Sequence, residues 1–128
     1  MPALTIRSLL AAIAILAAPA AASAAPVDCE LAMLKAATVV DLGGRAAASQ
    51  FYVEASDLAT GARIPAIDAA HRAKACGCPE AIPFLADAAL AAERTSASTF
   101  LTSMQQYGNE IRKSGEAAIA ALQKCAAR

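Results

Sequence analysis

Residues 100–125 read FLTSMQQYGNEIRKSGEAAIAALQKC, and their apolar and small side chains recur at intervals of three and four along almost the whole stretch. Spacing of this kind lines up one stripe of side chains along an α-helix. The stretch therefore predicts a helix over residues 98–126 with one buried face, and Cys125 lies on that face. The positions that keep the rhythm are Phe100, Met104, Tyr107, Ile111, Gly115, Ala118, Leu122 and Cys125.

A second long stripe begins close to the first cysteine and predicts a helix over residues 28–59, with Asp28 as its N-cap and Gly61 as its stop. The pair Gly43-Gly44 costs such a helix about 2 kcal/mol relative to alanines and could bend or break it. We interpret Gly44 as a close approach between helices or a kink, and not as a ligand contact. The stripe consists of Met33, Ala37, Val40, Gly44, Ala47 or Ala48, Phe51, Ala55 and Leu58.

Two shorter helices are expected between the long ones. Pro65 suits the first turn of a helix over residues 65–76. The next helix starts at Pro79 or Pro83, and we favour residues 83–94 because Pro83 would remove an internal hydrogen bond from the earlier start. It ends in the hydroxyl-rich run of residues 95–99. The whole pattern predicts a small all-α bundle of about four helices, tied by disulfides.

The first residues of the chain have the three parts of an export signal. Arg7 is followed by an apolar run from Leu9 to Ala18 and by the small-residue site at residues 22–24. This pattern predicts a secretory leader over residues 1–24 that is removed by cleavage, and a single domain over residues 25–128. The apolar run is too short to hold the mature protein in a bilayer, so we expect a periplasmic or secreted protein without stable membrane insertion.

The composition predicts a thin core and tightly spaced helices. Residues 25–128 contain 28 alanines against 24 larger apolar side chains (Val, Leu, Ile, Met, Phe and Tyr). A small domain with so little bulky apolar surface needs covalent crosslinks to offset the entropy of its chain. Without Arg7 the eleven basic residues become ten, against eleven acidic ones, and no block of like charge occurs. Nucleic acid is therefore not an expected partner.

In an exported protein of this size, four cysteines predict a disulfide framework. The close pair Cys76 and Cys78 leaves two arrangements to weigh. In one, Cys29 and Cys125 each bond one member of the pair, but a helix of about 45 Å followed by one of about 16 Å leaves Cys76 far from Cys29. In the other, Cys29 bonds Cys125, and Cys76 forms a strained bond with Cys78. This second arrangement suggests a thiol–disulfide redox protein, with Cys78 activated by a helix N-terminus and by Lys74.

The remaining chemistry of the sequence is sparse, and we expect no cofactor. His71 is the only histidine, and a metal site would need it together with the cysteine pair and Met33 or Met104. We interpret His71 instead as a partly exposed helix residue beside Asp68. Five scattered carboxylates are interpreted as solvated, and no nucleophile elbow or phosphate-binding loop occurs, so no catalytic residues are assigned. The five are Asp57, Asp68, Glu80, Asp87 and Glu93.

These observations favour an exported, non-catalytic helical protein that acts by binding a protein partner or a small apolar ligand, or as a structural component of the envelope. Phe51, Tyr52 and Val53 are adjacent and cannot all face one core, and Tyr52 is the candidate for exposure. The first alternative is the redox protein that uses Cys76 and Cys78. The second is a periplasmic holdase that opens in acid, when its carboxylates are protonated.

Overall fold

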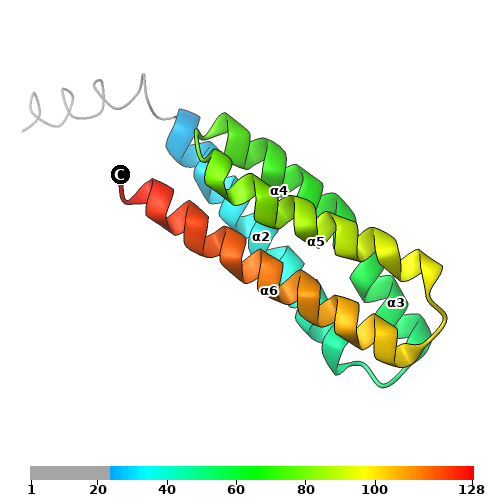
Figure 1. Ribbon diagram of the computed structural model, residues 1–128. Coiled ribbons are helices and arrows are strands. Elements are labelled where there is room, and N and C mark those ends of the chain that lie inside the picture. The colour runs from blue at the N-terminus through cyan, green and yellow to red at the C-terminus, as the bar shows by residue number, and fades with distance from the viewer. Residues whose placement is uncertain (1–23) are drawn as a thin grey trace, which may run out of the picture.

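The computed structural model describes residues 24–128, which form an antiparallel bundle of helices tied by two disulfide bonds (Figure 1). The predicted all-α, disulfide-stapled bundle is confirmed. The leader predicted over residues 1–24 lies outside the described residues, except for Ala24. In chain order the elements are α2 (Ala24–Ala48), α3 (Tyr52–Gly61), α4 (Arg63–Ala75), the 3₁₀ turn η1 (Pro79–Ala81), α5 (Ile82–Arg94), the 3₁₀ turn η2 (Thr95–Ala97) and α6 (Leu101–Ala126).

The helices pack as the four sides of an up-and-down bundle. α2 and α5 run away from the cysteine end, while α6 and the successive helices α3 and α4 return to it (Figure 1). α2 packs against α4 and α6, and α5 packs against the same two from the other side. Short connections between antiparallel neighbours are typical of this topology. Within residues 24–128, no helix is both long enough and apolar enough to cross a bilayer.

The helix predicted over residues 28–59 is wrong in its continuity, and the break lies elsewhere than at the glycine pair. α2 passes through Gly43 and Gly44 unbroken and ends at Ala48. Gly43 lies against the backbone of α6, where a Cβ atom would meet main-chain atoms at 2.7 Å. Close packing between α2 and α6 therefore outweighs the low helix propensity of the two glycines.

The turn between α2 and α3 is built by side chains that bond its backbone. The Ser49 hydroxyl donates to the Phe51 carbonyl at 3.2 Å and accepts from the Phe51 N–H at 3.3 Å. The Gln105 amide of α6 donates to the Ser49 carbonyl at 2.8 Å. Short hydroxyl side chains compete with helical hydrogen bonds in this way, so the helix ends here.

Two predicted helix ends are also corrected. Asp28 is not an N-cap, because α2 begins at Ala24, and it forms an ion pair with Arg72 at 3.1 Å instead. Gly61 does not end the first helix, because it is the last residue of α3 on the return path. Pro65 has no N–H to bond the Gly61 carbonyl, which accounts for the break between α3 and α4.

The core consists mainly of alanines and lies one residue away from the stripe predicted for the first helix. Alanines make up six of the nine residues in the core cluster near the cysteines and seven of nine in the next cluster along the bundle. Along α2 the helices approach so closely that small side chains take most of the buried positions, and Met33, Val40 and Leu42 are only partly buried. The buried positions of α2 are Ala32, Ala36, Val39, Gly43 and Ala46.

The stripe predicted for the last helix is confirmed over most of its length. Met104, Ile111 and Leu122 are fully buried, as are the small residues between them. Its first position is wrong, because Phe100 precedes the helix and 69% of its surface is exposed. Tyr107 is half-buried, and Gly108 takes the buried place beside it.

Candidate functional site

All four cysteines are bonded, and the chain reverses between the two bonds. Cys29 bonds Cys76 with a Cα separation of 5.2 Å, and Cys78 bonds Cys125 with a separation of 5.9 Å. Gly77 between them has a φ of +76°, a backbone conformation that favours glycine. The turn thereby directs Cys76 toward α2 and Cys78 toward α6. The redox hypothesis depends on a bond between Cys76 and Cys78. The structure instead bonds each of these cysteines to a distant one.

The length conflict in the sequence argument disappears because residues 52–59 belong to the return path. From Cys29 to the end of α2 the chain rises about 29 Å, and from the start of α3 to Cys76 it returns about 36 Å along its helices. The return is long enough to bring Cys76 back to Cys29. The conflict arose because the periodicity of residues 28–59 predicts one outgoing helix, whereas the chain turns back after Ala48.

The second disulfide lies beside an ion pair at the surface. Glu80 bonds Arg128 at 3.0 Å, and its other carboxylate oxygen lies 3.4 Å from the Cys125 sulfur. A hydrogen bond from its own backbone N–H, with the Arg128 guanidinium as the second cause, lowers the pKa of Glu80. Within residues 24–128, Cys78, Glu80 and Cys125 are the one group of Cys, His, Asp and Glu side chains with metal-binding spacing. The two sulfurs are bonded to each other, and metal binding needs thiolates.

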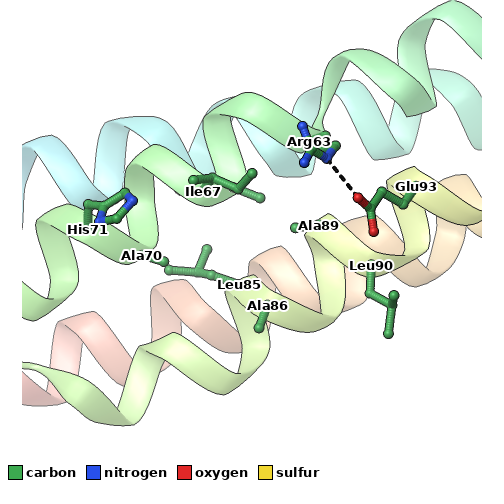
Figure 2. Close-up of a pocket in the computed structure, with 10 residues that line it drawn as sticks. Arg63, Ile67, Ala70, His71, Leu85, Ala86, Ala89, Leu90 and Glu93 are labelled. Carbon is green, nitrogen blue, oxygen red and sulfur yellow. Dashed lines mark hydrogen bonds and ion pairs between the residues drawn. The ribbon is translucent and has the colours of Figure 1, made fainter.

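His71 is exposed on α4 and lies at one end of a shallow groove between α4 and α5 (Figure 2). The groove has a volume of about 380 Å³ and a floor of alanine methyl groups with Leu85. At its other end, Arg63 and Glu93 point toward one another and form an ion pair at 3.2 Å. Because Arg63 and Glu93 neutralise each other, that end of the groove offers a small apolar group no free charge to orient it.

The scattered carboxylates are surface groups, as expected from the sequence, and three of the five are ion-paired. Glu80 pairs with Arg128 and Glu93 with Arg63, as described above, while Asp68 lies 4.0 Å from Lys35. Exposed pairs of this kind contribute little to stability.

The end of the bundle opposite the disulfides, which we call the apolar end, exposes three large apolar side chains. It consists of Phe51, Val53 and Phe100, with exposed fractions of 71%, 68% and 69%. Tyr52, the candidate for exposure, is exposed, but at 36% it is the least exposed residue of its run. Its hydroxyl donates to the Ser98 carbonyl at 2.8 Å and ties the two turns of this end together.

Both phenylalanines of the apolar end are held by the same local device. In Ser49-Gln50-Phe51 and again in Ser98-Thr99-Phe100, the serine hydroxyl accepts a hydrogen bond from the phenylalanine N–H, at 3.3 and 3.4 Å. Each phenylalanine then occupies the N-cap position of the helix that follows, in an extended conformation and without a side-chain cap bond. The two turns therefore present the two rings in the same way.

The two turns of the apolar end lie in uncharged stretches of the chain. Residues 46–53 and residues 95–109, which are runs of eight and fifteen positions, contain no Asp, Glu, Lys, Arg or His. Charged residues closely flank these stretches: Arg45 lies in the last turn of α2, Glu54 in the first turn of α3 and Arg94 in the last turn of α5. The apolar end is therefore uncharged in its two turns and is bordered by charged side chains of both signs.

The chain matches no protein-family model. No curated protein and no solved structure matches it. Its function is therefore inferred from its own residues. The repeated serine-polar-phenylalanine turn is visible in the sequence, but only the fold places both copies at one end.

Proposed function

We propose that this protein is an exported, non-catalytic binding protein that contacts its partner through the apolar end. The observation that carries the proposal is the pair of exposed phenylalanines at helix N-caps, Phe51 and Phe100. Ser, Thr, Asp and Asn are the residues that stabilise a helix from this position. Phenylalanine there leaves the cap bond unmade and its ring in water, so the fold gains little from either residue, whereas a contact surface gains two apolar anchors.

The rigidity of the apolar end supports a binding role. Hydrogen bonds from Ser49, Gln105 and Tyr52 fix both turns from which the rings project. A surface that is already ordered loses little conformational entropy on binding. The disulfides lie at the opposite end, so the crosslinks that stabilise the bundle leave this surface free.

The disulfides indicate an oxidising compartment, because cytosolic thiols are kept reduced. Together with the leader predicted over residues 1–24, they support our proposal that the protein is periplasmic or secreted. Export is tested by fractionating producing cells and measuring the mass of the recovered protein. Cleavage after Ala24 and four bonded cysteines are expected, whereas an uncut chain with free thiols in the cytosol contradicts export.

Binding through the apolar end is tested by photocrosslinking in the producing cells. We place benzoyl-phenylalanine at position 51, at position 100 and, as a matched control, at position 34, where Leu34 is 65% exposed on α2. The two apolar-end positions should give the same adduct, and position 34 should not give it. An absence of adducts at positions 51 and 100, or the same adduct from all three positions, contradicts the proposal.

A further inference from the structure

We propose that the bundle is a tandem repeat of one unit, a helical hairpin closed by its own disulfide. The inner face of each hairpin is a binding surface, and its partner is a second hairpin of the same kind. The first unit covers residues 29–76 and the second covers residues 78–125, and neither disulfide joins the two units. Because a two-helix hairpin cannot bury its own apolar stripe, each unit needs the other.

The residues that shape the hairpin recur at one spacing in the sequence. The two cysteines, the serine and the phenylalanine of the turn, and the first residue of the returning helix are each repeated 49 positions later. The pairs are Cys29 and Cys78, Ser49 and Ser98, Phe51 and Phe100, Tyr52 and Leu101, and Cys76 and Cys125. The two rings of the apolar end are therefore equivalent residues of the two units.

The pattern of burial repeats at the same spacing. Twelve residues are buried between Cys29 and Cys76, and a shift of 49 positions places eleven of them on buried residues of the second unit. The exception is Ser49, because Ser98 is half-buried. Helical periodicity by itself would not keep both helices of a hairpin in register across its turn, so the repeat covers the whole unit.

The helices are arranged as in a two-fold pair (Figure 1). α2 corresponds to α5, and α3 with α4 corresponds to α6, which is continuous where Ser114 replaces Pro65. Corresponding helices run in the same direction and lie diagonally across the bundle, since α2 and α5 each pack against α4 and α6. A half-turn about the long axis of the bundle therefore exchanges the two units, as in an isologous dimer.

Two seams join the units, and they differ at one contact. In the seam between α2 and α6, Gly43 of the first unit lies in backbone contact with Gly108 of the second. The corresponding residues in the other seam are Ala59 and Ala92, which are buried in one core cluster. A pair of two first units or of two second units would place glycine against alanine in both seams, so neither seam could close to backbone contact. The mixed pair is thereby preferred over both same-unit pairs.

The same difference accounts for the groove between α4 and α5 (Figure 2). In the closed seam a Cβ atom at Gly115 would meet the Val40 side chain at 2.8 Å. The shift of 49 positions replaces these two residues by Ala66 and Ala89, and both of them line the groove. The groove is therefore the wider of two equivalent seams, and its presence requires no ligand.

The experiment separates the units within the whole, oxidised protein. We insert a protease site after Gly77, between the two disulfides, and, as a matched control, after Gln50, inside the first unit. Before cleavage both chains should have the helix content and size of the wild type. Cleavage after Gly77 should leave a one-to-one pair of hairpins whose Tm falls on tenfold dilution, because the pair is now bimolecular. Cleavage after Gln50 should leave the pieces joined by the bond between Cys29 and Cys76, with a Tm that does not depend on concentration.

Native mass spectrometry of the cleaved protein then tests whether the units are equivalent partners. The mixed pair should be the main species, with pairs of two first units and of two second units as minor species. Gly43→Ala should raise the ratio of same-unit pairs to mixed pairs at least about fivefold, because it disrupts a contact that only the mixed pair makes. Gly44→Ala lies outside this contact and should change the ratio less than about twofold.

Three results overturn the inference. The first is unfolding of the protein at micromolar concentration on cleavage after Gly77. The second is the absence of same-unit pairs in both the wild type and Gly43→Ala, and the third is an equal change of the ratio in the two glycine variants.

A permuted chain provides the test if the insertion after Gly77 prevents folding. It begins at Cys78, passes from Arg128 through a glycine–serine linker to Ala24, and ends at Gly77, so each unit takes the place of the other in the chain. It should fold with the same two disulfides as the wild type. Failure of this chain to fold contradicts the repeat.

Discussion

Gly43 of α2 and Gly108 of α6 lie against each other with no room for a side chain between the helices. A Cβ atom added at Gly43 would lie 2.7 Å from the Gly108 carbonyl oxygen, and one added at Gly108 would lie 2.8 Å from the Gly43 carbonyl oxygen. Two turns further along α6, a Cβ atom added at Gly115 would come within 2.8 Å of the Val40 side chain. The two longest helices are therefore in backbone contact, which is why the core accepts little besides alanine.

This contact predicts opposite effects at two adjacent glycines. Gly43→Ala should destabilise the bundle by about 1 to 3 kcal/mol, because the clash is with main-chain atoms that cannot move aside. Gly44→Ala should stabilise it by up to about 1 kcal/mol, because the nearest atom lies at 3.6 Å on the flexible Arg112 side chain and alanine favours helix. Urea unfolding of the two variants measures both effects.

Gly108→Ala is the control for the partner helix and should resemble Gly43→Ala. Equal effects of Gly43→Ala and Gly44→Ala would show that α2 and α6 are farther apart than described.

Most of the fold follows from periodicity in the sequence. The three-four spacing from Met104 to Leu122 locates the last helix and its buried face, and Pro83 places the start of α5 within one residue. The hydroxyl-rich run after Arg94 marks a real end, where Thr95 bonds the Ala92 carbonyl at 2.6 Å. These features depend on interactions between residues that are close in the chain, so they can be predicted from the sequence.

What the sequence could not supply depends on contacts between distant segments. In an alanine-rich helix the stripes on either side of the core look alike, so periodicity places Met33 and Val40 inward although Ala32 and Val39 are the buried residues. The turn at Ser49 needs the side-chain amide of residue 105, which comes from another helix. The apolar end could not be predicted for the same reason, because its two turns are 49 residues apart in the chain (51 and 100).

The N-cap position of both phenylalanines predicts that their removal leaves the fold intact. Phe51→Ser and Phe100→Ser should each leave the free energy of unfolding unchanged or raise it by up to about 1 kcal/mol, because serine caps a helix and most of each ring is in water. The buried Leu85→Ala serves as the contrast and should cost about 2 to 5 kcal/mol. A loss above about 1 kcal/mol in either serine variant would mean that the ring is needed for folding, which would remove the reason to assign it to a contact surface.

The two disulfides should contribute about equally to stability. Each joins cysteines 47 positions apart, so in the chain-entropy model each contributes about 4 kcal/mol. Replacing Cys29 and Cys76 by serine, or Cys78 and Cys125, should leave a weakened bundle, and replacing all four should leave the chain largely unfolded. Peptide mapping without reductant should recover the two bonds seen here. Recovery of a bond between Cys76 and Cys78 would contradict the fold and revive the redox hypothesis.

Acid should leave the bundle helical, in contrast to what an acid-activated holdase requires. The buried polar residues within 24–128 are Ser49 and Thr95, and neither is ionisable. Protonation of surface carboxylates therefore does not expose the core, and the disulfides keep the helices together. Circular dichroism at pH 3 and at pH 7 should show similar helical content. A loss of most of the helix signal at pH 3 would favour the holdase alternative.

Glu80 should add a small acid-sensitive contribution at the disulfide end. The hydrogen bond from its own backbone N–H and the Arg128 guanidinium lower the pKa of Glu80 in the folded protein. Its contribution to the free energy of unfolding is therefore fully present above the ordinary pKa of glutamate, about 4.3, and is lost as the pH falls through the lowered value. Glu80→Gln should therefore lower the Tm at pH 7 by more than at pH 2.5, because protonation of the wild-type carboxyl in acid removes the same charge. Arg128→Gln, which removes the cation but leaves the carboxyl, should also lower the Tm at pH 7. Asp87 is an exposed carboxylate on α5, so Asp87→Asn is the matched control and should show no such pH dependence. An equal loss from Glu80→Gln at both pH values would show that the side chain acts by packing against Cys125 and not by its charge.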